Sequence, residues 1–226
     1  MKTRTAHFGR GLFEFLGELK ANNNREWFNA HKVRYIAEVE EPMLQFIADF
    51  GERIGNVSRR FVADPRRIGG SMFRIYRDTR FSRDKTPFKH GAGAHFRHEA
   101  HSKDRSVPGF YLHLEPGHSL GGGGIYHPDA VSLKQIRDRI AAKPGEWEAV
   151  VRKKLPIEGD TLTRPPAGYD PGHRLIEDIK RKDFYTMRNY TQRDVCSPDF
   201  LDSFLDASAH SAPLLKFLTK ALGLPW

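Results

Sequence analysis

The sequence predicts an α+β fold, in which a mainly antiparallel central sheet is flanked by N-terminal and C-terminal helices. Three observations support this prediction. Apolar residues recur at helical spacing near both ends of the chain. The middle of the chain instead has short apolar and aromatic runs separated by turn-forming residues. No internal repeat or flexible linker divides the chain, so we expect a single α+β domain over residues 1–226.

The first quarter of the chain is predicted to be helical. The opening segment has the i, i+3, i+4, i+7 spacing of an amphipathic helix, and its apolar positions are Leu12, Phe15, Leu16 and Leu19. Glu14 and Glu18 interrupt the apolar stretch and no small-residue cleavage site follows, so we expect a folded helix rather than a signal peptide. Helical spacing continues over residues 25–54, where Pro42 must either kink the helix or begin a new one.

Residues 66–127 are predicted to form strands and turns. The candidate strands are residues 72–76, 92–96, 109–114 and 124–126. Side chains alternate between the two faces of a strand, so Tyr111, His113 and Glu115 share a polar face. The glycines at 121–124 are interpreted as a tight turn or bulge, because no Gly-Lys-Ser/Thr follows to make a P-loop.

The remainder of the chain is predicted to be mostly helical. Helical spacing recurs at residues 131–140, 147–151 and 175–179. Residues 153–172 are rich in Pro and Gly and are expected to form a long loop, and residues 184–190 a final strand. Ser197, Pro198 and Asp199 favour the start of a C-terminal helix whose apolar positions run from 200 to 222.

The positive charge of the chain is concentrated in one segment. Residues 56–110 contain thirteen Lys and Arg against five Asp and Glu, so they supply +8 of the formal net charge of +9. Within them, residues 74–89 carry six cations and two carboxylates. A concentration of this kind indicates a local positive potential and an acidic partner. The predicted ligand-binding residues are Arg74, Arg77, Arg80, Lys85, Lys89, Tyr111, Gly123 and Gly124.

The leading functional hypothesis is a binding protein for a phosphate-bearing or polyanionic ligand. Arg holds such oxygens through a planar fork and Lys as a point charge. If the ligand is a nucleic acid, aromatic side chains between the phosphate contacts would stack on bases; these are Phe73, Tyr76, Phe81 and Phe88. No recognised nucleic-acid module is visible. An interaction protein that docks an acidic partner on the same basic face is a further possibility.

The alternative hypothesis is a hydrolase of phosphorylated or ester substrates. His113 and Glu115 would serve as base and orienting partner, together with Asp78 or Asp84, with or without a metal. The sequence alone assigns no metal site, because His95-x2-His98-x2-His101 matches no standard zinc motif. On a strand, the middle of these three histidines would also point away from the other two. No cofactor is indicated, and the sequence does not decide whether the protein is an enzyme.

Composition limits the cellular setting. No apolar run approaches the ~20 residues of a membrane-spanning helix, so no membrane partner is expected. The single cysteine, Cys196, cannot form an intramolecular disulfide, which fits a reducing compartment; we expect a cytoplasmic location. The sequence does not indicate an oligomeric state.

Four motifs identify a resemblance that spans about residues 8–220. They are Asn23-Asn24-Arg25-Glu26-Trp27-Phe28, residues 77–89 (RDTRFSRDKTPFK), residues 111–117 (YLHLEPG) and residues 123–128 (GGIYHP). With them the chain resembles an uncharacterised family of conserved proteins of unknown function, found in bacteria and fungi and carrying NNxxWF and RDxRFSxDKxPxK motifs. The resemblance implies family membership but no activity. Phe88 stands where members often have Tyr, so that ring is a poor candidate for proton transfer.

Overall fold

The N-terminal segment is helical, as predicted. The computed structural model describes residues 5–102 and 105–226, and its first elements are α1 (Arg10–Ala21), α2 (Arg25–Ala30), α3 (Lys32–Tyr35), the π-helical turn η1 (Ile36–Glu40) and α4 (Glu41–Ile54). The apolar stripe of α1 is buried. The Asn24 side chain caps α2 by accepting a hydrogen bond from the Trp27 amide at 2.9 Å.

Pro42 begins a helix rather than kinking one. It lies in the first turn of α4, where a missing N–H removes no intrahelical hydrogen bond. The turn just before it is π-helical, and the Glu41 amide donates to the Ile36 carbonyl five residues back. The chain therefore changes its helical pitch immediately before the proline.

The central sheet is an antiparallel meander of four strands in the order β1-β2-β3-β4, which confirms the predicted α+β class. The strands are β1 (Ala92–Arg97), β2 (Gly109–Leu114), β3 (Ser119–Ile125) and β4 (Phe184–Tyr190). The register pairs His95 with Tyr111 and Tyr111 with Gly122. Three helices, α5 (Ala130–Ala142), α6 (Pro144–Val151) and α7 (Ile176–Ile179), come between β3 and β4, and α8 (Gln192–Val195) and α9 (Phe200–Ala221) follow the sheet.

Two strand predictions were wrong. The glycines at 121–124 lie within β3 instead of in a turn or bulge. Gly121 and Gly123 face α9, and their lack of a side chain lets this helix lie close to the sheet. A Cβ on Gly121 would lie 2.7 Å from the Phe204 ring, and one on Gly123 would lie 2.8 Å from Leu215. Residues 72–76 form no regular strand; they make only isolated bridges, at Met72 and Tyr76.

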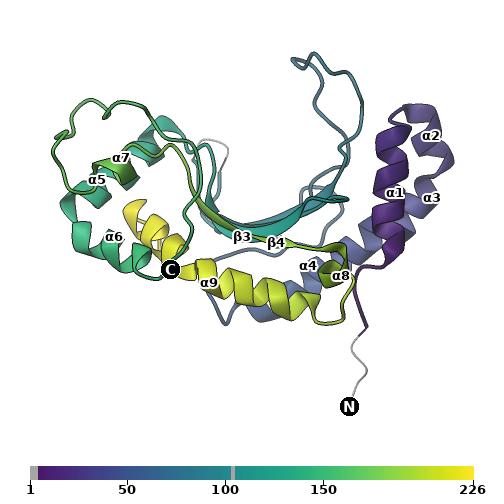
Figure 1. The fold of residues 1–226 in the computed structure, drawn as a ribbon. Helices are drawn as coiled ribbons and strands as arrows, with labels where there is room; N and C mark the ends of the chain where they lie inside the picture. Colours follow the sequence, from purple (N-terminus) through teal and green to yellow (C-terminus); the bar gives the residue numbers. More distant parts are fainter. Residues whose placement is uncertain (1–4, 103–104) are drawn as a thin grey trace.

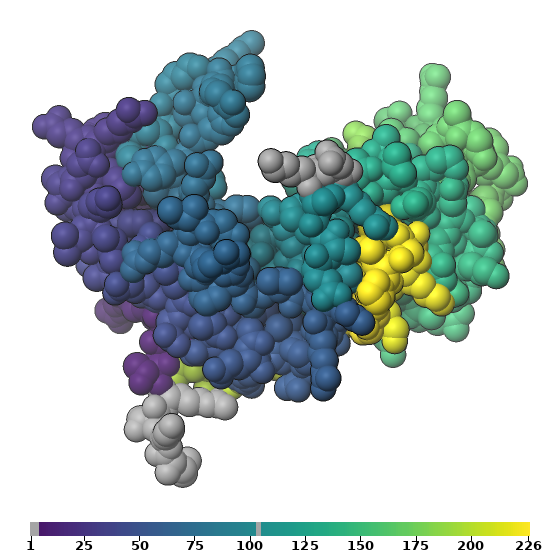
Figure 2. All heavy atoms as spheres, turned by 180° about the vertical axis from the view of Figure 1, so that it is seen from behind, coloured from purple at the N-terminus to yellow at the C-terminus, as the bar shows by residue number. Residues whose placement is uncertain are grey.

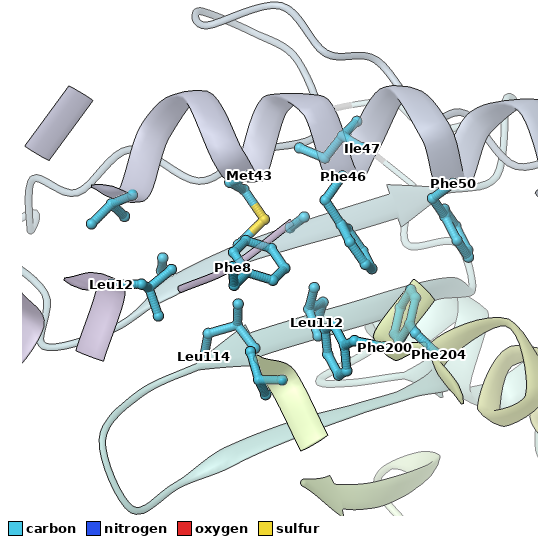
Figure 3. Close-up of a cluster of buried hydrophobic side chains, with 14 of the residues drawn as sticks. Phe8, Leu12, Met43, Phe46, Ile47, Phe50, Leu112, Leu114, Phe200 and Phe204 are labelled. Atoms are coloured by element: carbon cyan, nitrogen blue, oxygen red, sulfur yellow. The ribbon is translucent and has the colours of Figure 1, made fainter. Parts of the chain in front are cut away.

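One face of the sheet is covered by α4 and α9 (Figure 1). Phenylalanines from both helices lie between the helices and the strands (Figure 3). The Phe50 ring lies 4.9 Å from that of Phe204 and 4.3 Å from that of Phe96. A second cluster, centred on Trp147, joins α5, α6 and the C-terminal half of α9. This packing explains why the apolar side chains of the strands point toward the helices.

The other face of the sheet is open. The segment 74–89, defined here as the basic loop, rises beside it on the side of the N-terminal helices, and α5 to α7 rise on the opposite side (Figure 1). The space-filling view shows a hollow between these two walls (Figure 2). None of the described helices combines the length and the apolar character that a membrane crossing requires.

Candidate ligand-binding groove

The open face of the sheet carries the polar side chains that alternate with the core residues. On β1 these are His95 and Arg97, and on β2 they are Tyr111 and His113. The register places Gly122 beside Tyr111 and Gly124 beside Gly109, so β3 adds little side-chain bulk to this face. The result is a floor on which two strands display imidazole, guanidinium and phenol groups.

Two adjoining cavities occupy this floor and share Phe73 and Tyr111 as lining residues. The first, here the loop chamber, has a volume of about 490 Å³, and its polar lining is Arg77, Asp84, Lys89, His90, His113 and Glu115. The second, here the sheet chamber, has a volume of about 530 Å³, and its lining includes His95, Arg97, His101, Tyr126, Tyr185 and Met187. Together they form one groove with an aromatic divide.

Lys89 is one of the two cations of the loop chamber, the other being Arg77. Its Nζ donates to the Arg74 carbonyl at 2.8 Å and lies 5.1 Å from the centroid of the Phe73 ring. Burial, with the nearby charge of Arg74, lowers the pKa of this ammonium. In the part of the chain that the structure describes, Lys89 meets no carboxylate, so its charge is available to a ligand.

Arg97 is the cation of the sheet chamber. Its Nε donates to His95 Nδ1 at 3.0 Å, and one terminal nitrogen lies 2.9 Å from His101 Nε2. Burial, aided by the Arg97 charge, lowers the pKa of His95 to about 4, so its ring is neutral near pH 7. Among the described residues, the polar partners of Arg97 are thus imidazoles and not acids.

The cations at the tip of the basic loop are engaged differently. Arg80 forms a two-point pair with Asp78, at 3.0 and 2.7 Å, which lowers the pKa of that carboxyl to about 2. Lys85 donates to the Thr79 carbonyl at 2.9 Å. Neither residue lines the loop chamber or the sheet chamber, and the side chain of Arg80 is 77% exposed.

The predicted binding residues therefore divide into two groups. Those that line the groove are Arg77, Lys89, Tyr111 and Gly124; those that do not are Arg74, Arg80, Lys85 and Gly123. Gly123 faces Leu215 of α9 instead. Arg77 is paired with Asp84 and Thr86 at the rim of the loop chamber; the bonds that Asp84 accepts from the Thr86 amide and from Arg77 lower its pKa to about 2.

The predicted catalytic pair lies in the loop chamber. His113 Nε2 is 3.1 Å from Glu115 Oε2, and the Tyr111 hydroxyl is 3.4 Å from His113 Nδ1. Asp84 lines the same chamber, whereas Asp78 does not. Burial raises the pKa of Tyr111, with a contribution from the Glu115 charge, so this phenol stays protonated near pH 7.

The histidines at 95, 98 and 101 do not converge. His98 is buried, and its Nε2 lies 2.9 Å from the Pro225 carbonyl, on the opposite side of β1 from His95. Strand alternation predicts this separation.

The basic loop is fastened to the N-terminal helices. The Asn23 side chain bonds both backbone groups of Phe88: Nδ2 donates to the carbonyl and Oδ1 accepts from the amide, each at 3.0 Å. The Phe28 ring stacks on the Phe88 ring at 4.2 Å. Two motifs that are far apart in the sequence, NNxxWF and RDxRFSxDKxPxK, thus meet at the base of the loop.

Three residues of the site region were not among the predicted site residues. Arg97 lies outside the dense run of cations, and only its position two residues after His95 on one strand could have indicated it. Phe73 was considered only as a base-stacking residue, although it separates the two chambers. No sequence pattern indicated His118; the hairpin between β2 and β3 places it near His113.

Fold and site together define an α+β protein with an antiparallel meander whose open face is a basic, aromatic-lined groove. The chain belongs to the family described as "Conserved hypothetical protein (DUF2461)", whose model matches residues 11–217. This match confirms the resemblance drawn from the sequence. Comparisons with curated proteins and with solved structures gave no significant match.

Proposed function

We propose that the groove on the open sheet face binds a phosphate-bearing or otherwise polyanionic ligand. The observation that supports this most strongly is that Lys89 and Arg97 line the groove while neither meets a carboxylate among the described residues. Cations held in a cavity by neutral partners keep their field for an incoming anion.

The hydrogen bonds of Arg97 leave room for a ligand. A guanidinium carries five N–H donors, and the imidazoles of His95 and His101 take one each. The remaining donors suit the planar, two-point recognition of phosphate or carboxylate oxygens. His95 is neutral near pH 7, so it accepts a hydrogen bond from Arg97 and orients the guanidinium. It adds no second buried charge to the chamber.

The aromatic divide favours a ligand with a flat apolar part beside its anionic part. Phe73 and Tyr111 stand between the two cations, and Tyr126 and Tyr185 line the far part of the sheet chamber. Nucleotides and single-stranded nucleic acids combine rings and phosphates in this way, and stacking contributes about 1–3 kcal/mol per base.

The first test compares affinities for pyrophosphate, ATP and a short single-stranded oligonucleotide, measured by calorimetry on the whole chain. Because a hydrogen bond to a charged group is worth about 1.5–3 kcal/mol, Arg97→Met and Lys89→Met should each weaken binding by about 10- to 100-fold. Arg152→Met is the matched control, since this exposed arginine lines neither chamber. Unchanged affinity in both groove variants would refute the proposal.

The tip of the basic loop distinguishes short ligands from long ones. Arg80→Glu with Lys85→Glu should lower the affinity for the oligonucleotide and leave pyrophosphate binding unchanged, because both residues lie outside the chambers. An equal loss for both ligands would instead place the tip residues in the binding site, as the sequence predicts.

A hydrolase of phosphorylated or ester substrates is the second candidate function. It is favoured by the 3.1 Å contact between His113 and Glu115 in the same chamber as Lys89 and Arg77. His113 would take the proton of an attacking water while Glu115 holds its ring, and the cations would bind the charged oxygens. The test is turnover of generic phosphate and carboxylate esters, which His113→Gln should abolish and Arg152→Met should leave intact. If the wild-type chain turns over none of these esters, the binding function stands without catalysis.

A further inference from the structure

The hairpin between β2 and β3 brings three metal-ligating side chains together. One ligand atom from each of His113, Glu115 and His118 lies within 4.8 Å of the other two. The His118 amide donates to the Glu115 carbonyl at 3.0 Å, and Gly117 has a φ of 76°. With Pro116 before that glycine, these are the features of a type II turn, which fixes the positions of Glu115 and His118.

We propose that His113, Glu115 and His118 bind a divalent first-row transition metal ion at the edge of the loop chamber. Two imidazoles and one carboxylate form the ligand set of His₂Glu zinc sites and of facial-triad iron(II) sites, both of which leave positions open. The inference goes beyond the proposed anion binding and does not depend on it. The sequence alone assigned no metal site and left open whether the protein binds a metal.

The surroundings of His113 fit a metal ligand. Its Nε2 faces Glu115, while its Nδ1 is 3.4 Å from the Tyr111 hydroxyl. If Nε2 binds the ion, Nδ1–H donates to the phenol oxygen, which is the outer contact that metal-bound histidines usually have. Gly91 leaves space for the ring: a Cβ there would lie 2.7 Å from His113 Cε1.

The two other ligands can complete the site with small movements. Metal–ligand distances of about 2.0–2.2 Å require donor atoms closer together than in this structure. His118 is exposed in the turn, so its side chain is free to approach. Lys20 lies 3.6 Å from Glu115 Oε1, whereas Oε2 faces His113. This ammonium competes with the ion for the carboxylate and would remain on the outer oxygen.

The open positions of a bound ion would face a ligand. His113 and Glu115 line the loop chamber with Arg77 and Lys89, whereas His118 lies outside it. The ion would therefore sit between the hairpin and the chamber, beside two cations that attract oxyanions. For the second candidate function the ion would take the place of His113 as the group that activates water, because a metal-bound His113 has no free nitrogen to accept the proton.

The test is calorimetric titration of the whole, untagged chain with Zn²⁺, and with Co²⁺ followed by its visible absorption. One ion should bind per chain. His118→Asn should weaken binding by at least about 100-fold, because altering an outer-shell contact alone costs 10- to 100-fold. His118 is a suitable position since its turn bond uses the backbone. The control is His210→Asn, which removes an exposed imidazole from α9.

Two outcomes would overturn the proposal: no binding of Zn²⁺, Co²⁺ or Fe²⁺, or binding that His118→Asn and His113→Asn leave unchanged. The result is separable from the anion proposal. Arg97→Met should lose pyrophosphate and keep Zn²⁺, while His118→Asn should lose Zn²⁺ and keep pyrophosphate binding in metal-free buffer.

Discussion

At the residue scale, the environment of Arg97 distinguishes it from the other cations. Arg80 pairs with Asp78 at the exposed tip of the loop, where an ion pair contributes little to stability. Because the two charges offset each other, the pair attracts an anion only weakly. Arg97 meets two imidazoles inside a cavity instead. The same kind of side chain is thus paired with an acid at the loop tip and left without one on the sheet, and the proposed function rests on this difference.

His95 should make stability depend on pH. Its folded-state pKa, about 4, lies below the ordinary value of 6.5. The unfolded chain therefore binds the proton first, and the contribution of the neutral ring is present in full above about pH 6.5 and is lost as the pH falls toward 4. We expect the free energy of unfolding of His95→Gln, measured by urea titration, to fall less over this range than that of the wild type. His210→Gln should follow the wild type; a His95→Gln curve parallel to both would contradict the assignment.

Lys20 offers a second prediction at this scale. Lys20→Met removes the ammonium that lies 3.6 Å from Glu115 and frees that oxygen. If a metal ion binds the hairpin, this variant should bind Zn²⁺ more tightly than the wild type in calorimetry. Lys134→Met is a control of equal charge, since Lys134 pairs with Asp138 in α5. Weaker Zn²⁺ binding after Lys20→Met would mean that the ammonium supports the site rather than competing with the ion.

At the element scale, the glycines of β3 allow α9 to pack closely against the sheet. Gly121 and Gly123 face α9, where a side chain would meet Phe204 or Leu215 at under 3 Å. The long helix α9 can therefore lie close to the sheet. Phenylalanines between α4 and α9 fill the rest of this core (Figure 3). The strand is thus specified by what packs against it and not by its own hydropathy.

Gly123→Val should destabilise the protein by about 1–3 kcal/mol, the usual cost of overpacking a core. Gly17→Ala is the control: it lies within α1, a Cβ there meets nothing within 4 Å, and alanine should stabilise the helix by about 0.5–1 kcal/mol. Both values come from urea unfolding. A neutral Gly123→Val would show that α9 can move away from the sheet.

The attachment of the basic loop is the other feature of this scale. Asn23 satisfies both backbone groups of Phe88, so Asn23→Ala leaves two polar groups unpaired in a partly buried place. We expect faster hydrogen exchange across residues 74–89 and weaker pyrophosphate binding through Lys89. Asn22→Ala is the control, since its side chain donates to the Glu18 carbonyl within α1 and makes no hydrogen bond to Phe88. Unchanged exchange would assign the attachment to the Phe28 and Phe88 rings alone.

At the scale of the whole molecule, the chain has a formal net charge of +9, and Arg77, Lys89 and Arg97 line the groove on the open face of the sheet. If an oligonucleotide binds, its affinity should fall with salt, with a log–log slope of about −0.7 per phosphate contacted. Contacts to Arg77, Lys89 and Arg97 alone predict a slope near −2 by this rule. A slope near zero would exclude a nucleic acid as the ligand.

Much of the fold was predictable because its side chains alternate or recur with a clear period. The strands at 109–114 and 184–190 agree with β2 and β4. Of β3, the candidate strand at 124–126 covered only the end, since glycines carry no hydropathy signal and their role depends on α9, which is distant in sequence. Residues 72–76 have the composition of a strand but find only isolated partners.

The site was predictable in part. Charge density indicated the basic loop, and strand alternation placed Tyr111, His113 and Glu115 on one face. The density of charge along the sequence does not show where each side chain points. It therefore could not distinguish Lys89, which lines the groove, from Lys85 at the tip of the basic loop. The placement of Arg97 and His118 depends on strand register and on a turn, which composition does not record.

The open side of β3 has a consequence for selectivity. Gly124 is paired with Gly109 of β2, and both glycines line the sheet chamber with main chain alone. A guest lying flat there touches peptide planes, which differ little from one protein to another. Discrimination between ligands must then come from the basic loop and from α5 to α7 on the opposite side. Substitutions in these segments should change which ligand is preferred without altering the sheet.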